Sequence, residues 1–231
     1  MCDVKPNVIE EYTAYYTKKN YTQIYPSEWV VRTFLADYPR LNMKKPQTGD
    51  VVIDVSCGDG RNLLFLARQG YKAFGTEISS EIAAAAKERV FNNGFNAEVR
   101  VGNNTNLPFG DSFADYALAA YCMYYCNSGD TFAAISAEYA RVIKPGGYII
   151  AAVLSADSPL VSKSECVSDC LYVVRKDEYG LRNGYRLFAA SDEKDVTDAM
   201  GKFFTDFSFG REINDFYGFE NNLYWVTARR I

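Results

Sequence analysis

The 231-residue chain contains no histidine, so the side chain that most often acts as a general base is absent. It also has no excess of basic residues: the formal net charge is -4 at pH 7, and the pI is about 5.1. Electrostatic attraction to nucleic acid or to an anionic membrane is therefore not expected. Any acid–base chemistry has to come from Asp, Glu, Tyr, Lys or Cys.

Long apolar runs are absent as well. No run is long enough to cross a bilayer, and the N-terminus has no signal-peptide core, so we expect a cytoplasmic protein whose 6 cysteines are thiols. The pairs Cys122/Cys126 and Cys166/Cys170 share an i, i+4 spacing that is not typical of a zinc knuckle. Buried small hydrophobic residues are the better interpretation than a four-thiolate site, and no metal is predicted.

The chain alternates between strand-like and helix-like segments. Strands are predicted near residues 51–54, 73–78, 97–101, 116–120, 148–154, 207–213 and 223–228, with helices between most of them. An apolar stripe at helical spacing, Val30, Val31, Phe34, Leu35 and Tyr38, predicts a further helix before the first strand. This order predicts an α/β fold with a seven-stranded, mostly parallel sheet and helices on both faces.

A glycine-containing turn, Ser56-Cys57-Gly58-Asp59-Gly60, joins the first predicted strand to a helix. Such a turn exposes backbone N–H groups beside a sheet edge and suits a nucleotide-like ligand. A dinucleotide fingerprint, G-x-G-x-x-G, would need its third glycine at Leu63, and the acid Asp54 is foreign to it. NAD therefore fits the turn poorly.

The segment Asp54-x-Ser56-x-Gly58-x-Gly60 resembles motif I of class I S-adenosylmethionine-dependent methyltransferases, usually written D/E-x-G-x-G-x-G. Four further segments resemble that family's motifs in the family's order: Glu77, residues 102–109, residues 112–118 and residues 138–147. The resemblance covers about Asp50 to Val153 and implies a Rossmann-like fold. Ser56 replaces the family's first glycine, and Asn103 replaces the acid of its adenine loop.

The resemblance implies S-adenosylmethionine as the cofactor and S-adenosylhomocysteine as its product. Glu77 would then accept hydrogen bonds from the ribose hydroxyls. The expected cofactor-binding residues are Asp54, Ser56, Cys57, Gly58, Gly60, Asn62, Glu77, Ile78, Asn103, Asn104, Thr105 and Ala120. The alternatives are that Asp54 only bonds the N–H groups of the turn and that Glu77 is a surface charge.

Tyrosines follow the fourth strand at the edge where open α/β sheets bind ligands. A ring there could face the sulfonium, and a hydroxyl could orient the acceptor, so the expected catalytic residues are Tyr121, Tyr124 and Tyr125. The expected acceptor-binding residues are Tyr16, Tyr25 and Arg186. The guanidinium groups of Arg175, Arg182 and Arg186, in the insertion, could clamp a carboxylate or phosphate of an acidic acceptor. The alternatives are a core aromatic cluster for the tyrosines and solvated surface charge for these arginines.

The length suits one α/β domain over residues 1–231. Within it we expect an N-terminal aromatic lid and helix, a cofactor-binding core, an acceptor-side insertion after the fifth strand, and a closing helix with strands. These segments cover residues 1–45, 50–153, 155–190 and 191–231.

We predict transfer of a methyl group to an oxygen of a small-molecule acceptor, on a sugar, a phosphate-type group or a carboxylate. Residues 25–28 and 60–62 resemble small-molecule methyltransferases, some of them from surface-polysaccharide pathways. The expected partners are the acceptor and, in a homodimer, a second copy of the chain, without nucleic acid or membrane. The alternatives are methylation of nitrogen or of a protein side chain, a non-catalytic S-adenosylmethionine-binding partner protein, and a dehydrogenase.

Overall fold

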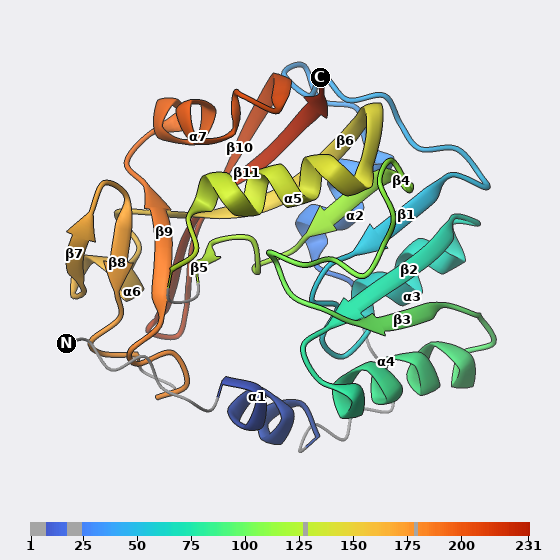
Figure 1. Ribbon diagram of the computed structural model, residues 1–231, viewed down its shortest axis with the longest axis horizontal. Helices are drawn as coiled ribbons and strands as arrows, with labels where there is room; N and C mark the ends of the chain where they lie inside the picture. Colours follow the sequence, from blue (N-terminus) through green and yellow to red (C-terminus); the bar gives the residue numbers. More distant parts are fainter. Residues whose placement is uncertain (1–7, 18–24, 127–128, 178–179) are drawn as a thin grey trace.

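The structure of the protein is a computed structural model that describes residues 8–17, 25–126, 129–177 and 180–231. Its central sheet runs, from one edge to the other, through β3 (Glu98–Val101), β2 (Lys72–Glu77), β1 (Val51–Asp54), β4 (Ala114–Ala119), β6 (Ile143–Ser155), β11 (Phe219–Arg230) and β10 (Phe204–Phe216) (Figure 1). Neighbouring strands from β3 to β6 are parallel, whereas β11 is antiparallel to both β6 and β10. The predicted α/β fold with a mostly parallel central sheet is confirmed, whereas the predicted count of seven strands is too low.

Four more strands extend the sheet to eleven. They are β5 (Tyr125–Cys126), β7 (Glu165–Ser168), β8 (Leu171–Val173) and β9 (Arg186–Ala190), and the short helix α6 (Pro159–Ser162) precedes β7. β9 pairs with the end of β6 through Leu154 and Ala189. The segment after β6 therefore continues the sheet beyond the carboxyl end of that strand.

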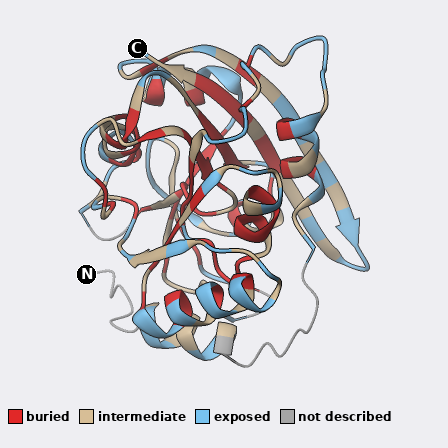
Figure 2. Ribbon diagram, turned by 90° about the vertical axis from the view of Figure 1, so that its right-hand side faces the viewer, coloured by how far each residue is buried: buried red, intermediate tan, exposed pale blue. Residues whose placement is uncertain are grey.

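Helices cover both faces of the sheet, as predicted. α2 (Glu28–Leu35), α3 (Arg61–Arg68) and α4 (Ser80–Asn92) pack on one face, whereas α5 (Phe132–Val142) and α7 (Glu193–Met200) pack on the other. In β4, Leu118 packs in the core on the face covered by α2, α3 and α4. Its neighbours Ala117 and Ala119 pack in the core on the face covered by α5 and α7, because successive strand residues point to opposite faces. Figure 2 shows the buried residues gathered in the strands and on the inner sides of the helices.

The N-terminal elements differ in how they are held. α1 (Val8–Thr17) lies apart from the sheet, between α4 and the side formed by β7 to β9 (Figure 1). α2 is buried through Trp29, Val30 and Phe34, whereas Leu35 and Tyr38 are 51% and 43% exposed. The expected stripe was therefore wrong at its C-terminal end, because the helix ends at Leu35.

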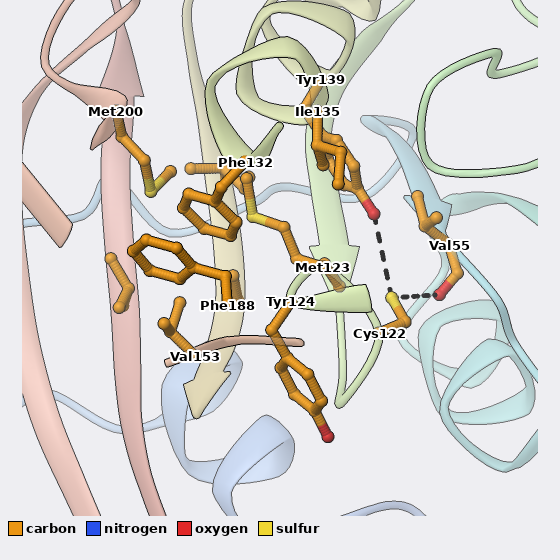
Figure 3. Packing of buried hydrophobic residues seen from close by; sticks show 14 of the residues in the cluster. Val55, Cys122, Met123, Tyr124, Phe132, Ile135, Tyr139, Val153, Phe188 and Met200 are labelled. Carbon is orange, nitrogen blue, oxygen red and sulfur yellow. Dashed lines mark hydrogen bonds between the residues drawn. The ribbon is translucent and has the colours of Figure 1, made fainter. Parts of the chain in front are cut away.

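A stacked pair of rings joins the extension to the main core. Phe132 of α5 and Phe188 of β9 lie with ring centroids 3.9 Å apart, and Met123 and Met200 are drawn around them in Figure 3. Removing a buried phenylalanine side chain typically costs about 3–5 kcal/mol. The stack therefore fixes β9 relative to α5.

None of the described helices is long and apolar enough to cross a bilayer.

Candidate active site

The turn between β1 and α3 has a left-handed backbone at three positions. The φ angles are 53° at Ser56, 58° at Gly58 and 78° at Gly60. Ser56 adopts this conformation at a cost of about 1–2 kcal/mol relative to glycine. At Gly60, an added Cβ would lie 3.3 Å from the carbonyl oxygen of Ala86. Gly60 therefore serves the close approach of α4 to the turn.

Glu77 at the end of β2 holds this turn in place. Its side chain is buried, with Oε1 accepting from the Gly58 N–H at 2.6 Å and Oε2 accepting from the Ile78 N–H at 2.9 Å. Burial raises the pKa of Glu77, and these two backbone bonds oppose the rise. Each carboxylate oxygen keeps a second lone pair, so Glu77 can accept from two ligand hydroxyls as well. Its 4% exposure excludes the surface-charge alternative.

Asp54 at the end of β1 carries an unpaired oxygen. The side chain is 1% exposed, and Oδ2 has no hydrogen-bond partner. Burial raises the pKa of Asp54 well above its usual range, with Glu77 and Asp59 adding to the rise and a bond from the Leu63 N–H opposing it. Asp54 thus bonds the first turn of α3 and keeps one acceptor for a ligand. A buried acceptor without a partner is costly, so a ligand donor there would be favourable.

The polar loop after β3 is largely bonded to itself and to the next segment. Asn103 Oδ1 accepts from the N–H and from the hydroxyl of Thr105, each at 3.0 Å. Asn104 donates through Nδ2 to the carbonyl oxygen of Cys122 at 2.8 Å and accepts from the Tyr139 hydroxyl at 2.9 Å. Asn104 therefore anchors the segment that follows β4.

These elements surround a cavity of about 920 Å³. Single small ligands occupy pockets of roughly 300–1,000 Å³, so the volume suits a nucleoside-sized ligand together with a small second molecule. Of the expected cofactor-binding residues, the cavity is lined by Asp54, Ser56, Cys57, Gly58, Asn62, Glu77, Ile78, Asn103, Asn104 and Ala120. Gly60 and Thr105 do not line it, because the first packs against α4 and the second folds back on Asn103.

All three expected catalytic tyrosines line the cavity, but their hydroxyls have different partners. Tyr121 has φ of 62° and donates to Glu212 Oε2 of β10 at 3.3 Å, and Glu212 does not line the cavity. Tyr124 and Tyr125 stack with centroids 5.0 Å apart, and in Figure 3 the Tyr124 ring points away from the labelled core side chains. Burial raises the pKa of each hydroxyl, so all three are protonated at neutral pH.

Helix α1 spans the cavity from one end to the other. The Tyr16 ring touches the turn, since a Cβ on Gly58 would lie 2.8 Å from its hydroxyl oxygen. Thr13 donates to the Ser79 hydroxyl at 2.9 Å, and Tyr12 donates to the Tyr125 hydroxyl at 3.0 Å. Tyr16, which was expected to bind the acceptor, therefore lines the cavity at the glycine turn.

Tyr25 is not brought to the site. It is 73% exposed and does not line the cavity. Tyr25 lies just before α2, outside the cavity, and its side chain is exposed to solvent. The expectation that Tyr25 binds the acceptor therefore has no support in the geometry.

The arginines after β6 divide into two groups. Arg186 and Arg182 line the cavity, and Arg182 forms an ion pair with Asp177 at 2.9 Å. Arg175 is exposed, is ion-paired with Glu165 and does not line the cavity. The surface-charge alternative therefore suits Arg175 and not Arg182.

The cysteines form no metal site within the described residues, where no three His, Cys, Asp or Glu side chains could hold an ion. Cys122 and Cys126 are buried, and the Cys122 thiol donates to the Val55 carbonyl oxygen at 3.2 Å (Figure 3). Cys166 is exposed. Burial raises the pKa of Cys122 and of Cys126 to about 12, so these thiols are unreactive at neutral pH.

Several lining residues were missed by the sequence analysis. Tyr12, Lys163, Lys176, Asp177 and Tyr185 were not among the predicted site residues, yet all line the cavity. Tyr12 had a weak signal in the tyrosine-rich N-terminal segment. The others lie in loops or strands whose position depends on tertiary contacts, and no spacing points to them.

The central part of the chain is similar to a known domain family. Residues 52–147 match a protein-family model described as a methyltransferase domain. This range contains the glycine turn, Glu77, the polar loop and the tyrosines after β4.

Two curated relatives are similar over about half of the chain. A malonyl-[acyl-carrier protein] O-methyltransferase from Marinomonas sp. is 34% identical over 119 residues, which is 50% of this chain and 42% of that protein. A tRNA (carboxymethyluridine(34)-5-O)-methyltransferase from Arabidopsis thaliana is 25% identical over 136 residues, which is 57% of this chain and 32% of that protein. The chain thus spans less than half the length of these relatives.

A solved structure supports the fold. A crystal structure of a SAM-dependent methyltransferase from Methanosarcina mazei superposes with a TM-score of 0.66 at 22% sequence identity, covering 80% of this chain and 94% of that one. The similarity extends beyond the matched family range to most of the sheet.

Proposed function

We propose that the protein transfers a methyl group from S-adenosylmethionine to an oxygen of a small-molecule acceptor. The match of residues 52–147 to a methyltransferase-domain family model supports the methyl transfer, and the similarity to the Methanosarcina mazei structure supports the fold. The observation that carries the proposal is one cavity with two dissimilar ends. The glycine turn, Glu77 and Asp54 form one end, and tyrosines with basic residues form the other.

The residues of the first end fit the cofactor. The unpaired Oδ2 of buried Asp54 suits the ammonium group of its methionine part, and the remaining lone pairs of Glu77 suit the two ribose hydroxyls. When bound, the cofactor supplies a methyl group on a sulfonium. Asn62 accepts from the Ser27 N–H at 2.9 Å and so ties the start of α2 to this end.

The chain itself contributes orientation and exclusion of water. Tyr16 covers the glycine turn, and α1 closes the cavity between Ser79 and Tyr125. The protonated hydroxyls of Tyr124 and Tyr125 are donors that orient the acceptor. Holding two reactants in line accounts for a large part of the rate enhancement in such displacements.

Two relatives support oxygen as the methylated atom, since both are named as transferring a methyl group to oxygen. The test uses cofactor labelled in the methyl group with fractions of small metabolites, total tRNA and total protein. We expect label in a small-molecule fraction. Binding of S-adenosylhomocysteine without transfer to any fraction would favour a non-catalytic binding protein.

A nucleic-acid acceptor is the second candidate, because the Arabidopsis relative is named as a tRNA methyltransferase. Label that enters tRNA and is lost after ribonuclease treatment would establish it. The net charge of -4 argues against it. A place in surface-polysaccharide synthesis stays a prediction.

A further inference from the structure

The two ends of the cavity carry opposite charge. Asp54, Asp59 and Glu77 lie at the glycine turn. The basic lining residues, apart from Arg61 beside the turn, all come from the segment after β6: Lys163, Lys176, Arg182 and Arg186. A basic pocket in a protein with a net charge of -4 concentrates anions at that place.

The carboxylates at the basic end are fewer than the cations. They are Asp157, Asp177 and Glu220 among the described lining residues. Asp157 is paired with Arg211 at 3.1 Å, and Arg211 does not line the cavity. Asp177 is paired with Arg182. An excess of positive charge therefore remains for a ligand.

Arg182 is the cation whose geometry is fixed. Its side chain is 17% exposed and that of Asp177 is 2% exposed, and the guanidinium donates from Nη2 to Asp177 Oδ1 at 2.9 Å and from Nε to Oδ2 at 3.2 Å. Asp177 Oδ2 also accepts from the N–H groups of Leu181 and Arg182 at 3.0 Å and 2.9 Å. Asp177 is thus held by the backbone and orients the guanidinium.

Donors remain on this oriented guanidinium. Asp177 takes two of its five N–H groups. A further side-chain hydrogen bond runs between Arg182 and Tyr125, whose hydroxyl also accepts from Tyr12 at 3.0 Å. The guanidinium N–H groups that neither Asp177 nor Tyr125 takes are left as charged donors of the kind that binds a carboxylate.

Aromatic rings lie beside the Arg182 guanidinium. Tyr12, Tyr125 and Tyr185 lie with ring centroids 6.1 to 6.4 Å apart, and all three line the cavity. The Tyr12 hydroxyl donates to Tyr125 and the Tyr185 hydroxyl donates to Glu11 at 3.4 Å, so the rings offer mainly an apolar wall that suits the body of a small ligand.

Few groups at the basic end can take a proton from the acceptor. The chain has no histidine, and the cavity tyrosines are protonated at neutral pH. Among the described carboxylates that line this end, Asp157 is paired with Arg211 and Asp177 accepts four hydrogen bonds, which leaves Glu220. An acceptor that is already anionic avoids the need for general-base catalysis.

We propose that the acceptor is a small carboxylic acid methylated on its carboxylate, and that Arg182, oriented by Asp177, determines this specificity. The inference rests on the proposed methyl transfer. One carboxylate oxygen accepts from Arg182, and the other forms the new bond to the methyl carbon. The carbon–sulfur bond breaks with its electron pair staying on sulfur, no proton is displaced, and a methyl ester results.

The test measures binding of matched probes by ligand-observed NMR, with and without S-adenosylhomocysteine. Phenylacetate, phenylacetamide and benzylphosphonate share an aromatic body and differ in the anionic group. We expect phenylacetate to bind at least about tenfold more tightly than the amide, as is typical of a charge-assisted contact. Equal binding of acid and amide, or tighter binding of the phosphonate, would overturn the proposal.

Variants test whether Arg182 is the residue that makes the protein prefer the acid over the amide. Arg182→Gln should abolish the preference for the acid, whereas Arg175→Gln should keep it, because Arg175 is exposed and outside the cavity. The double variant Arg182→Gln/Asp177→Asn removes the carboxylate that the single change leaves unpaired, and it should lose the preference too. Retained acid preference in either Arg182 variant contradicts the assignment.

The product gives a second readout. Label transferred to a carboxylate returns as volatile methanol after mild alkali, whereas methyl groups on ether oxygen or on nitrogen stay in place. Alkali-stable label in the small-molecule product would overturn the carboxylate assignment while leaving methyl transfer intact. Absence of S-adenosylhomocysteine binding by calorimetry would instead remove the proposed function, with the NMR comparison still interpretable without it.

Discussion

At the scale of single residues, the two buried acids of the glycine turn have different roles. Glu77 uses both oxygens to hold backbone N–H groups, whereas Asp54 leaves Oδ2 without a partner. Both have raised pKa values because they are buried. The site therefore carries a stability cost at neutral pH that a cationic ligand can relieve.

Replacing Asp54 should make the fold more stable and cofactor binding weaker. Its folded-state pKa is raised, so its neutral form favours folding, and its contribution is lost as pH rises through that pKa. Asp54→Asn should therefore raise the Tm near pH 7, by about 2–4 °C for each kcal/mol relieved. It should also weaken S-adenosylhomocysteine binding by calorimetry.

The pH dependence provides the control for this variant. The gain in Tm should shrink as pH is lowered, because the wild-type carboxyl becomes neutral. A gain in Tm that is constant down to acid pH would show that the charge of Asp54 is not its cause.

Replacing Glu77 should weaken cofactor binding. Glu77→Ala removes two acceptors for the ribose hydroxyls and should cost about 1–3 kcal/mol, or roughly five- to 150-fold in affinity. Glu88→Ala, an exposed acid on α4, is the matched control and should leave the affinity unchanged. Unchanged affinity in Glu77→Ala, measured by calorimetry well below its Tm, would refute the ribose contact.

At the scale of elements, α1 stands out because it closes the cavity without burying its own side chains. It has 10 residues, and none of residues 8–16 is buried. Helices of this length are marginal alone. Its position therefore depends on the contacts of Tyr12, Thr13 and Tyr16 with three separate parts of the site.

A double-mutant cycle tests the contact between α1 and the glycine turn. Gly58→Ala should destabilise the protein through its φ of 58°, by about 1–2 kcal/mol, and through the clash with Tyr16. Adding Tyr16→Ala should relieve the second part only, so the two changes should not be additive in denaturant unfolding. Strict additivity would mean that Tyr16 does not rest on Gly58.

The elements also show why part of the site escaped prediction. Periodicity located the strands and the glycine turn, since both depend on local pattern. It placed Leu35 and Tyr38 inward, although α2 ends at Leu35. Periodicity also could not distinguish Arg182 from Arg175. Asp177 holds Arg182 at the cavity, whereas Glu165 holds Arg175 at the surface, and such pairings depend on the tertiary structure.

At the scale of the whole molecule, ligand binding should stabilise the fold. S-adenosylhomocysteine at about 100 times its Kd should contribute about 2.7 kcal/mol, which raises the Tm by roughly 5–11 °C. NADH at the same concentration should leave the Tm unchanged, because Leu63 stands where a dinucleotide turn has glycine. Stabilisation by NADH alone, in a thermal scan, would revive the dehydrogenase alternative.

The sequence by itself determined the parallel strands, the glycine turn and the acids at the ends of β1 and β2. These follow from hydrophobic period and from positions in a motif, which are local properties of the chain. Only the tertiary structure decided the acceptor end, where Tyr12 reaches Tyr125 across 113 residues and Asp177 orients Arg182. Such contacts depend on how loops pack against one another, and the spacing of residues along the chain does not encode that packing.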